Sequence, residues 1–316
     1  MANGIIVTSL VVGGLAIGAS AQVLTTTVSP TQTAAKTISA KTAVTAATTQ
    51  PLLGVSSTWP LTTAVTAVEL VGVQTAAAVS TPATPVLTPL LPLNLTTMRL
   101  WNWGGNWIGS EWSNGNSPLP WKFGHINQPA GADTLFTLDA TGAPEIQAGS
   151  AEAKTDGVWE SEVTLPQLRD GLVVAPLWLY DSTSRDEIDF ELAGRNGLDV
   201  TMHVYVNGVH KHNSVRLFAG TDLSGQRKRF GIKVDQHTGY VEMYVDGKRV
   251  QRWDKSTLGY FVSHPIKPWL EMWAANPSNS GFVQWVGKWT PLAAGQQLTM
   301  RVHGYGYKTL TGQIVI

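Results

Sequence analysis

The sequence contains no cysteine and carries no net charge, with 22 basic and 22 acidic residues among 316. Without cysteine there can be no disulfide, no thiolate zinc site and no thiol nucleophile. Balanced charge gives no electrostatic reason to expect nucleic acid or a membrane surface as a partner, and we interpret the short basic run at residues 226–229 as the solvated start of a strand. Tryptophan, in contrast, is abundant, with 13 residues. These indoles either fill a large β core or stack on sugar rings.

Charge is nearly absent from the first 97 residues, where only Lys36, Lys41 and Glu69 are charged. Residues 22–97 are rich in Ala, Thr, Val, Ser and Pro and lack the bulk for a core of their own. They therefore predict a low-complexity linker, or an assembly segment that contacts a cell envelope or a larger particle. Residues 1–21 combine an apolar stretch with the signal-peptidase-like Ala19-Ser20-Ala21, but no basic residue precedes the stretch. A cleaved signal, an uncleaved anchor and a segment built into an assembly all remain open, so we expect an extracellular or envelope-associated protein, or alternatively a virion component.

From residue 98 to residue 316 the pattern changes to short apolar runs separated by turn residues. Asp246-Gly247 joins two such runs, which is a strong two-residue hairpin signal. We find no convincing amphipathic helix, and the pattern predicts an all-β sandwich. The expected strands are residues 158–165, 172–180, 187–192, 198–206, 230–234, 240–245, 249–253, 269–273, 282–289 and 297–303.

Three acidic residues alternate with apolar ones in the run Glu187-Ile188-Asp189-Phe190-Glu191. Successive side chains of a strand point to opposite faces, so the three acids share one face. The Cα atoms of Glu187 and Glu191 should lie about 13 Å apart, and both side chains can lean inward. Two carboxyl groups roughly 5–5.5 Å apart are what retaining glycoside hydrolysis requires. The alternative is an exposed edge strand whose acids have no catalytic role.

This run, with its preceding Asp186, resembles the signature of glycoside hydrolase family 16, the concanavalin-like β-jelly-roll enzymes. It has the unbulged form that is typical of the lichenase and xyloglucan-transferase branches. The resemblance covers about residues 98–308 and implies a jelly-roll sandwich with a concave substrate cleft. Further motifs that carry it are Val200-Thr201-Met202-His203-Val204-Tyr205-Val206-Asn207-Gly208, Tyr244-Val245-Asp246-Gly247, Leu270-Glu271-Met272-Trp273 and Gln284-Trp285-Val286-Gly287.

The resemblance implies a role for each acid of the trio. Glu187 would be the nucleophile, Glu191 the general acid and then the general base, and Asp189 the residue that tunes the nucleophile. Two positions depart from the family pattern: Glu271 stands where lichenases often have an amide, and Glu162 where a basic residue is common. The substrate therefore cannot be carried over. Seven positions match substrate contacts in the family, namely Trp178, Tyr180, His203, Tyr205, Glu271, Trp273 and Trp285.

Taken together, these features predict a retaining endo-β-glycosidase whose partner is a β-linked polysaccharide, either a glucan or a bacterial exopolysaccharide or capsule. Transglycosylation is a close alternative, and a carbohydrate-binding or structural module on the same fold is the rival from another class. An inactive module should have lost an acid of the trio, and all three are present. We expect no cofactor and no catalytic metal, although a structural calcium ion is compatible with the family. His210 and His212 lie two residues apart on an expected loop with no further evident ligand.

Overall fold

The computed structural model describes residues 89–130, 132–311 and 314–315. The predictions for residues 1–21, and those for residues 22–88, lie outside the described residues. Residues just before Met98 already contact the folded part of the chain. Leu91 exchanges two backbone hydrogen bonds with Tyr305, and Leu93 is buried in the hydrophobic core. Among the described residues, no helix combines the length and apolarity needed to cross a bilayer.

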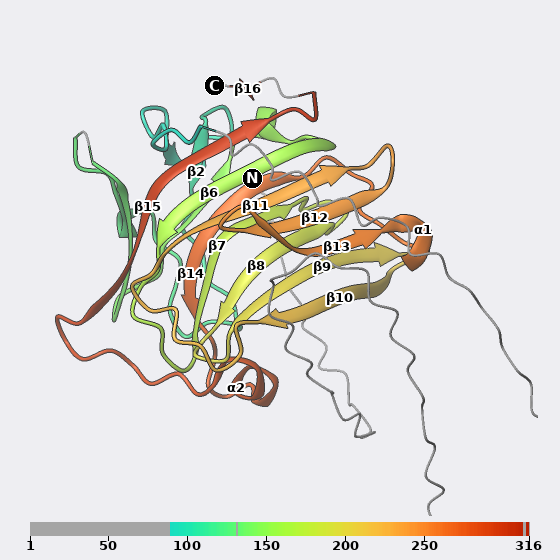
Figure 1. The fold of residues 1–316 in the computed structure, drawn as a ribbon. Coiled ribbons are helices and arrows are strands. Elements are labelled where there is room, and N and C mark those ends of the chain that lie inside the picture. The colour runs from blue at the N-terminus through green and yellow to red at the C-terminus, as the bar shows by residue number, and fades with distance from the viewer. Residues whose placement is uncertain (1–88, 131, 312–313, 316) are drawn as a thin grey trace, which may run out of the picture. The chain divides into compact units, whose positions relative to one another are not determined.

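Two sheets form a sandwich, as the sequence predicts (Figure 1). The first sheet contains eight strands in the order β1 (Arg99–Leu100), β2 (Trp107–Gly109), β5 (Glu145–Ala148), β14 (Lys267–Ala274), β7 (Leu172–Tyr180), β8 (Glu187–Ala193), β9 (Leu198–Val206) and β10 (Val209–Leu217). The second follows the order β13 (Lys248–Asp254), β12 (Tyr240–Val245), β11 (Arg227–Asp235), β6 (Asp156–Thr164), β15 (Gln297–Lys308), β4 (Thr134–Asp139) and β3 (Ile126–Asn127), with β16 (Ile314–Val315) paired to β15.

The core lies between the sheets and is formed by every second side chain of each strand, on the side that points inward. On β8, Ile188, Phe190 and Leu192 are fully buried. The Phe190 ring meets Phe230 of β11 at a centroid distance of 5.2 Å, which joins the two layers. Burying one such side chain contributes about 1.5–3 kcal/mol. The alternate side chains of β8, Glu187, Asp189 and Glu191, must therefore point to the outer face of the first sheet. We call this face, defined by these three residues, the carboxylate face.

An extra residue near Pro176 kinks β7 but leaves β8 regular. Between Val174 and Leu177 the register of β7 shifts against β8, while β8 pairs with β9 without interruption. Proline has no N–H to give to a ladder, so inside a sheet it belongs at a bulge. The unbulged form of the acidic motif predicted from the sequence is therefore confirmed, because the irregularity lies in the neighbouring strand.

Two expectations for local structure are wrong. Residues 282–289 do not form a strand, because Ser280–Val286 is the helix α2, whose start is capped by the Asn279 side chain accepting hydrogen bonds from two backbone N–H groups. His210 and His212 do not lie on a loop, because they belong to β10, which returns directly after the Asn207-Gly208 turn. The short helix α1 (Lys255–Leu258) was also not predicted.

Candidate active site

The three predicted catalytic acids project from β8 onto one face of the first sheet. Asp189 is only 1% exposed, and Glu187 and Glu191 flank it and are partly buried. The ladder between β8 and β9 places His203 opposite Glu187 and Asp199 opposite Glu191. The two glutamates therefore have different neighbours, although they lie on the same strand.

Glu187 faces a cation. The Nε2 atom of His203 lies 3.4 Å from Oδ2 of Asp189, and Glu187, Asp189 and His203 each bring one polar atom within 4.8 Å of the others. Burial opposes the charge on His203, but contact with Asp189 and Glu187 outweighs it and raises the pKa of His203 to about 9. Burial, with the charge of Asp189, raises the pKa of Glu187 to about 7 against the opposing effect of the imidazolium. His203 thus favours an ionised Glu187.

Glu191, in contrast, is surrounded by acids. Burial, followed by repulsion from Asp189, Glu187, Glu271 and Asp199, raises the pKa of Glu191 well above its usual range. A carboxyl group in such surroundings keeps its proton at neutral pH. The pKa of both glutamates is raised, but the His203 imidazolium opposes the shift at Glu187, whereas acids surround Glu191.

Histidines on β9 and β10 extend the contacts of Asp189. The Nδ1 atom of His203 lies 2.9 Å from Nε2 of His210, and the two rings stack at 5.1 Å. His212 stacks on the same group, at 5.3 Å from His210. Because burial and the charge of His203 lower the pKa of His210 to about 4, His210 is neutral and its Nε2 can accept a hydrogen bond from the protonated Nδ1 of His203. A metal ion bound by Glu187, Asp189 and His203, whose ligand atoms lie within 4.8 Å of one another, would have to displace the proton of His203.

Asp199, which no sequence motif singles out, organises the end of the face near Glu191. Arg216 of β10 donates two hydrogen bonds to the Asp199 carboxylate, each 2.7 Å long. The indole Nε1 of Trp285 donates a third, at 2.6 Å. Trp285 then meets Trp273 at 6.2 Å. The predicted contact Trp285 is thus held by a charge-assisted network that joins α2 to β9 and β10.

A second pair of carboxyl groups lies beside the trio, on β5 and β14. Glu271 and Glu145 are opposite each other in the ladder, and both are almost fully buried. Trp121 donates to Glu271 at 3.1 Å, and Trp112 donates to Glu145 at 3.0 Å. Burial first, and then the neighbouring carboxyl, raises the pKa of Glu271 well above its usual range. The position at which lichenases often have an amide is therefore occupied here by one of two buried carboxyl groups that face each other.

The remaining predicted contacts are aromatic and lie on the same face. Trp178 is opposite Asp189 and Tyr180 is opposite Glu187 in the ladder between β7 and β8. The two rings meet at 5.4 Å. Tyr205 stacks on His210 at 4.9 Å.

Trp273 shares the parity of these residues but is only 8% exposed. It packs against Trp121 and Phe282. Trp273 therefore also supports its neighbours by packing, as well as sharing their face of the sheet.

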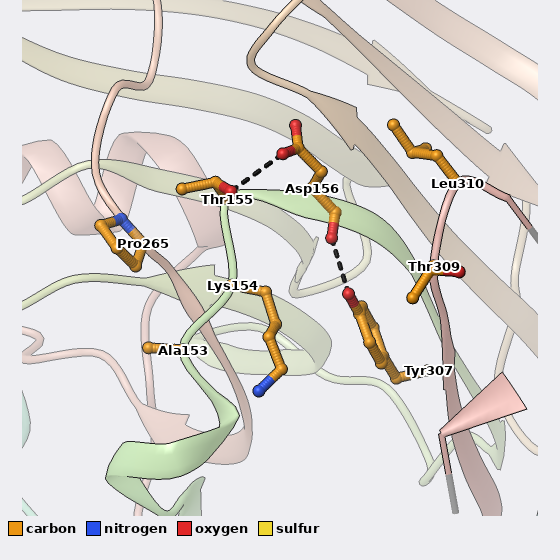
Figure 2. Close-up of a pocket in the computed structure, with 8 residues that line it drawn as sticks. All are labelled: Ala153, Lys154, Thr155, Asp156, Pro265, Tyr307, Thr309 and Leu310. Atoms are coloured by element: carbon orange, nitrogen blue, oxygen red, sulfur yellow. Dashed lines mark hydrogen bonds between the residues drawn. The ribbon is translucent and has the colours of Figure 1, made fainter. Parts of the chain in front are cut away.

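A separate pocket lies where β6 begins and β15 ends (Figure 2). In it, the Tyr307 hydroxyl donates to the backbone carbonyl of Asp156 at 2.7 Å, and Thr155 donates to the Asp156 carboxylate at 2.9 Å. None of the predicted site residues lines this pocket. Its polar groups bind one another and form no constellation with the carboxylate face.

Comparison with protein families gives a match to the model described as "Glycosyl hydrolases family 16", over residues 114–290, which is more than half of the chain. A "Beta-glucanase" of Acetivibrio thermocellus is 27% identical over 203 residues, which cover 60% of this chain and 56% of that protein. A "Xylanase/beta-glucanase" of Ruminococcus flavefaciens is 26% identical over 137 residues, which cover 40% and 17%. The chain thus spans little more than half the length of the first of these relatives.

Solved structures share the sandwich. A prokaryotic β-1,3-1,4-glucanase (lichenase) derived from a mouse hindgut metagenome aligns with a TM-score of 0.52 and 20% identity, over 65% of this chain and 93% of its own. The Bacillus licheniformis β-glucanase aligns with a TM-score of 0.51 and 19% identity, over 64% and 91%. At these identities the alignments show a common fold.

Proposed function

The chain belongs to glycosyl hydrolase family 16, and from this membership we propose that it is an endo-acting glycoside hydrolase that cleaves a β-linked glucan with retention of anomeric configuration. The observation that carries the proposal is the contrast between the two glutamates of β8. Glu187 has the His203 imidazolium beside it, whereas Glu191 is surrounded by carboxylates. A retaining glycosidase needs one ionised nucleophile and one protonated acid.

In the first step, a carboxylate oxygen of Glu187 attacks the anomeric carbon while the glycosidic C–O bond breaks. The leaving oxygen takes the proton of Glu191. In the second step, water attacks the same carbon, Glu191 takes a proton from the water, and the bond to Glu187 breaks. Overall, one glycosidic bond is hydrolysed by one water molecule to give two shorter sugar chains. An acceptor sugar in place of the water would give transglycosylation.

Asp189 and His203 assist without bonding to the substrate carbon. The buried Asp189 carboxylate, 3.4 Å from the His203 ring, holds the imidazolium where its charge also reaches Glu187. As the nucleophile becomes neutral in the covalent intermediate, the imidazolium retains Asp189 as its counterion. Trp178 is partly exposed next to the trio and offers ring surface on which we expect a sugar unit to stack, with the buried Tyr180 packed against it.

The substrate class follows the relatives, whose names include β-glucanase and lichenase. The test is a panel of mixed-linkage β-glucan, β-1,3-glucan, xyloglucan and bacterial exopolysaccharides, assayed for new reducing ends and for fall in viscosity. We expect a rapid fall in viscosity on a β-glucan, and proton NMR should show the β anomer first. Glu187→Gln should reduce the rate by at least about 10⁴-fold, which corresponds to about 5.5 kcal/mol of activation free energy.

Three results would contradict the proposal. One is undiminished activity of Glu187→Gln. Another is an α anomer as first product, which would indicate inversion. The third is tight binding of a polysaccharide without any cleavage, which would favour the carbohydrate-binding module instead.

A further inference from the structure

Two tryptophans protrude from the loop between β1 and β2, before the region that matches the family model. Trp101 is 40% exposed and Trp103 is 51% exposed. Their rings stack on each other, with centroids 6.0 Å apart and planes inclined by 27°. Leu100 beside them is also exposed. A contiguous aromatic surface of this kind costs free energy in water and is typical of a binding site.

The backbone holds this surface in an unfavourable conformation. Trp101 has φ at +54°, a region that a bulky side chain rarely adopts. Its N–H donates to the Gly109 carbonyl, and the Trp103 N–H donates to the Trp101 carbonyl. The Asn102 side chain ties the loop to the carbonyl of Thr97 at 2.9 Å. Such strain persists where the surroundings over-determine it, and it concentrates at functional sites.

Lys267 of β14 links the pair to the first sheet. Its Nζ lies 5.1 Å from the centre of the Trp103 ring and 5.4 Å from that of Trp269. It also donates a 2.7 Å hydrogen bond to the side chain of Gln147 on β5. The ammonium group is thus fixed between an exposed indole and a buried one.

From the buried Trp269, ring contacts continue to the neighbour of the catalytic strand. Trp269 meets Trp178 at 4.9 Å, and Trp178 is opposite Asp189 in the ladder. Four strand-to-strand steps separate β2 from β8 in the sheet order, which is about 19 Å at about 4.8 Å a step. A ligand reaching from the carboxylates to the exposed pair must therefore be an extended chain.

We propose that Trp101 and Trp103 form a distal sugar-binding platform that holds the same β-linked polysaccharide several units away from the bond that is cleaved. The flat C–H face of a pyranose ring suits an exposed indole, and the Lys267 ammonium, held by the buried Gln147, supplies a polar partner for hydroxyl groups at the junction. The platform rests on the proposed function for the identity of its ligand. It adds a specificity for chain length that the catalytic carboxylates cannot provide.

The test compares substrates of different length. The double variant Trp101→Ala/Trp103→Ala is assayed on a long β-glucan and on a short oligosaccharide too small to span about 19 Å. We expect kcat/KM on the long substrate to fall at least tenfold through a higher KM. The kcat, and all values on the short substrate, should stay unchanged.

Phe218→Ala is the matched control, because Phe218 is also an exposed aromatic with a positive φ, of +55°. It follows β10 at the opposite edge of the sheet. The single variant Trp103→Phe should bind the long substrate better than the double alanine variant does, because it keeps an aromatic ring. If the alanine substitutions acted by damaging the fold, an aromatic ring at this position would not restore binding selectively.

An equal loss on both substrates, or no loss, overturns the platform. A change in the oligomeric state of the double variant, with no difference between long and short substrates, also overturns it. That result would show that the two tryptophans pack against another protein molecule. If the native protein cleaves no polysaccharide, the proposed function fails, and affinity electrophoresis through gels containing the same polysaccharides decides the platform separately. Retardation that is lost in the double variant supports it, and absence of retardation contradicts it.

Discussion

Replacing Glu187 by Gln should make the protein more stable at neutral and alkaline pH while abolishing its activity. The native carboxyl group is partly buried beside Asp189, and burial raises its pKa from 4.5 to about 7. The amide of Gln has nearly the same shape but no charge to keep away from water. The substitution therefore removes an electrostatic cost that we attribute to the catalytic role of Glu187.

The size of this effect follows from the pKa of Glu187. A folded-state pKa about 2.5 above the ordinary value corresponds to about 3 kcal/mol, at 1.36 kcal/mol for each pKa unit. Because the folded-state pKa is raised, the stabilising effect of the proton is complete below about pH 4.5 and is lost as the pH rises through about 7. The gain in the variant should then be absent near pH 4.5 and complete above pH 7. Since His203 loses a partner in the variant, about 3 kcal/mol is an upper limit.

The assay is urea unfolding followed by tryptophan fluorescence at pH 5, 6, 7 and 8. At pH 8 the variant should unfold at a higher urea concentration, and its melting temperature should rise by up to about 6–12 °C for a domain of this size. Glu111→Gln, at an exposed position, is the control and should change little at any pH. An equal gain at pH 5 and pH 8, or a loss at pH 8, would refute the electrostatic reasoning.

Two further perturbations test the neighbours of the trio. Glu271→Gln removes one of the charges that raise the pKa of Glu191, so the alkaline limb of the pH profile of kcat/KM should move to lower pH; an unmoved limb would mean that the two groups are not coupled. His210→Phe keeps a stacked ring but removes the Nε2 acceptor 2.9 Å from His203. The pKa of His203, followed by NMR, should then fall below about 9, and an unchanged value would contradict this contact.

Strand patterns carried most of the fold prediction, because they depend on local geometry. The alternation at residues 187–192 sets which side chains face the core, and the structure confirms it with Ile188, Phe190 and Leu192 fully buried. The mistaken strand at residues 282–289 had a local signal that favoured a helix. Asn279 is a good N-cap residue, and Phe282 and Val286 are four positions apart, as on one helical face. His210 lies on a strand and not on the expected loop, because Asn207-Gly208 is a two-residue hairpin turn that leads directly into β10.

The amino-acid order is enough to place three acids on one face of a strand in a β sandwich, because side-chain alternation is a property of the extended backbone. The surroundings of each acid, in contrast, depend on the tertiary fold. Ladder register brings His203 to Glu187 and Asp199 to Glu191, and it joins Glu145 to Glu271 although they are far apart in the chain. Protonation depends on burial and on charges a few ångströms away, so the difference between Glu187 and Glu191 emerges only when distant strands meet.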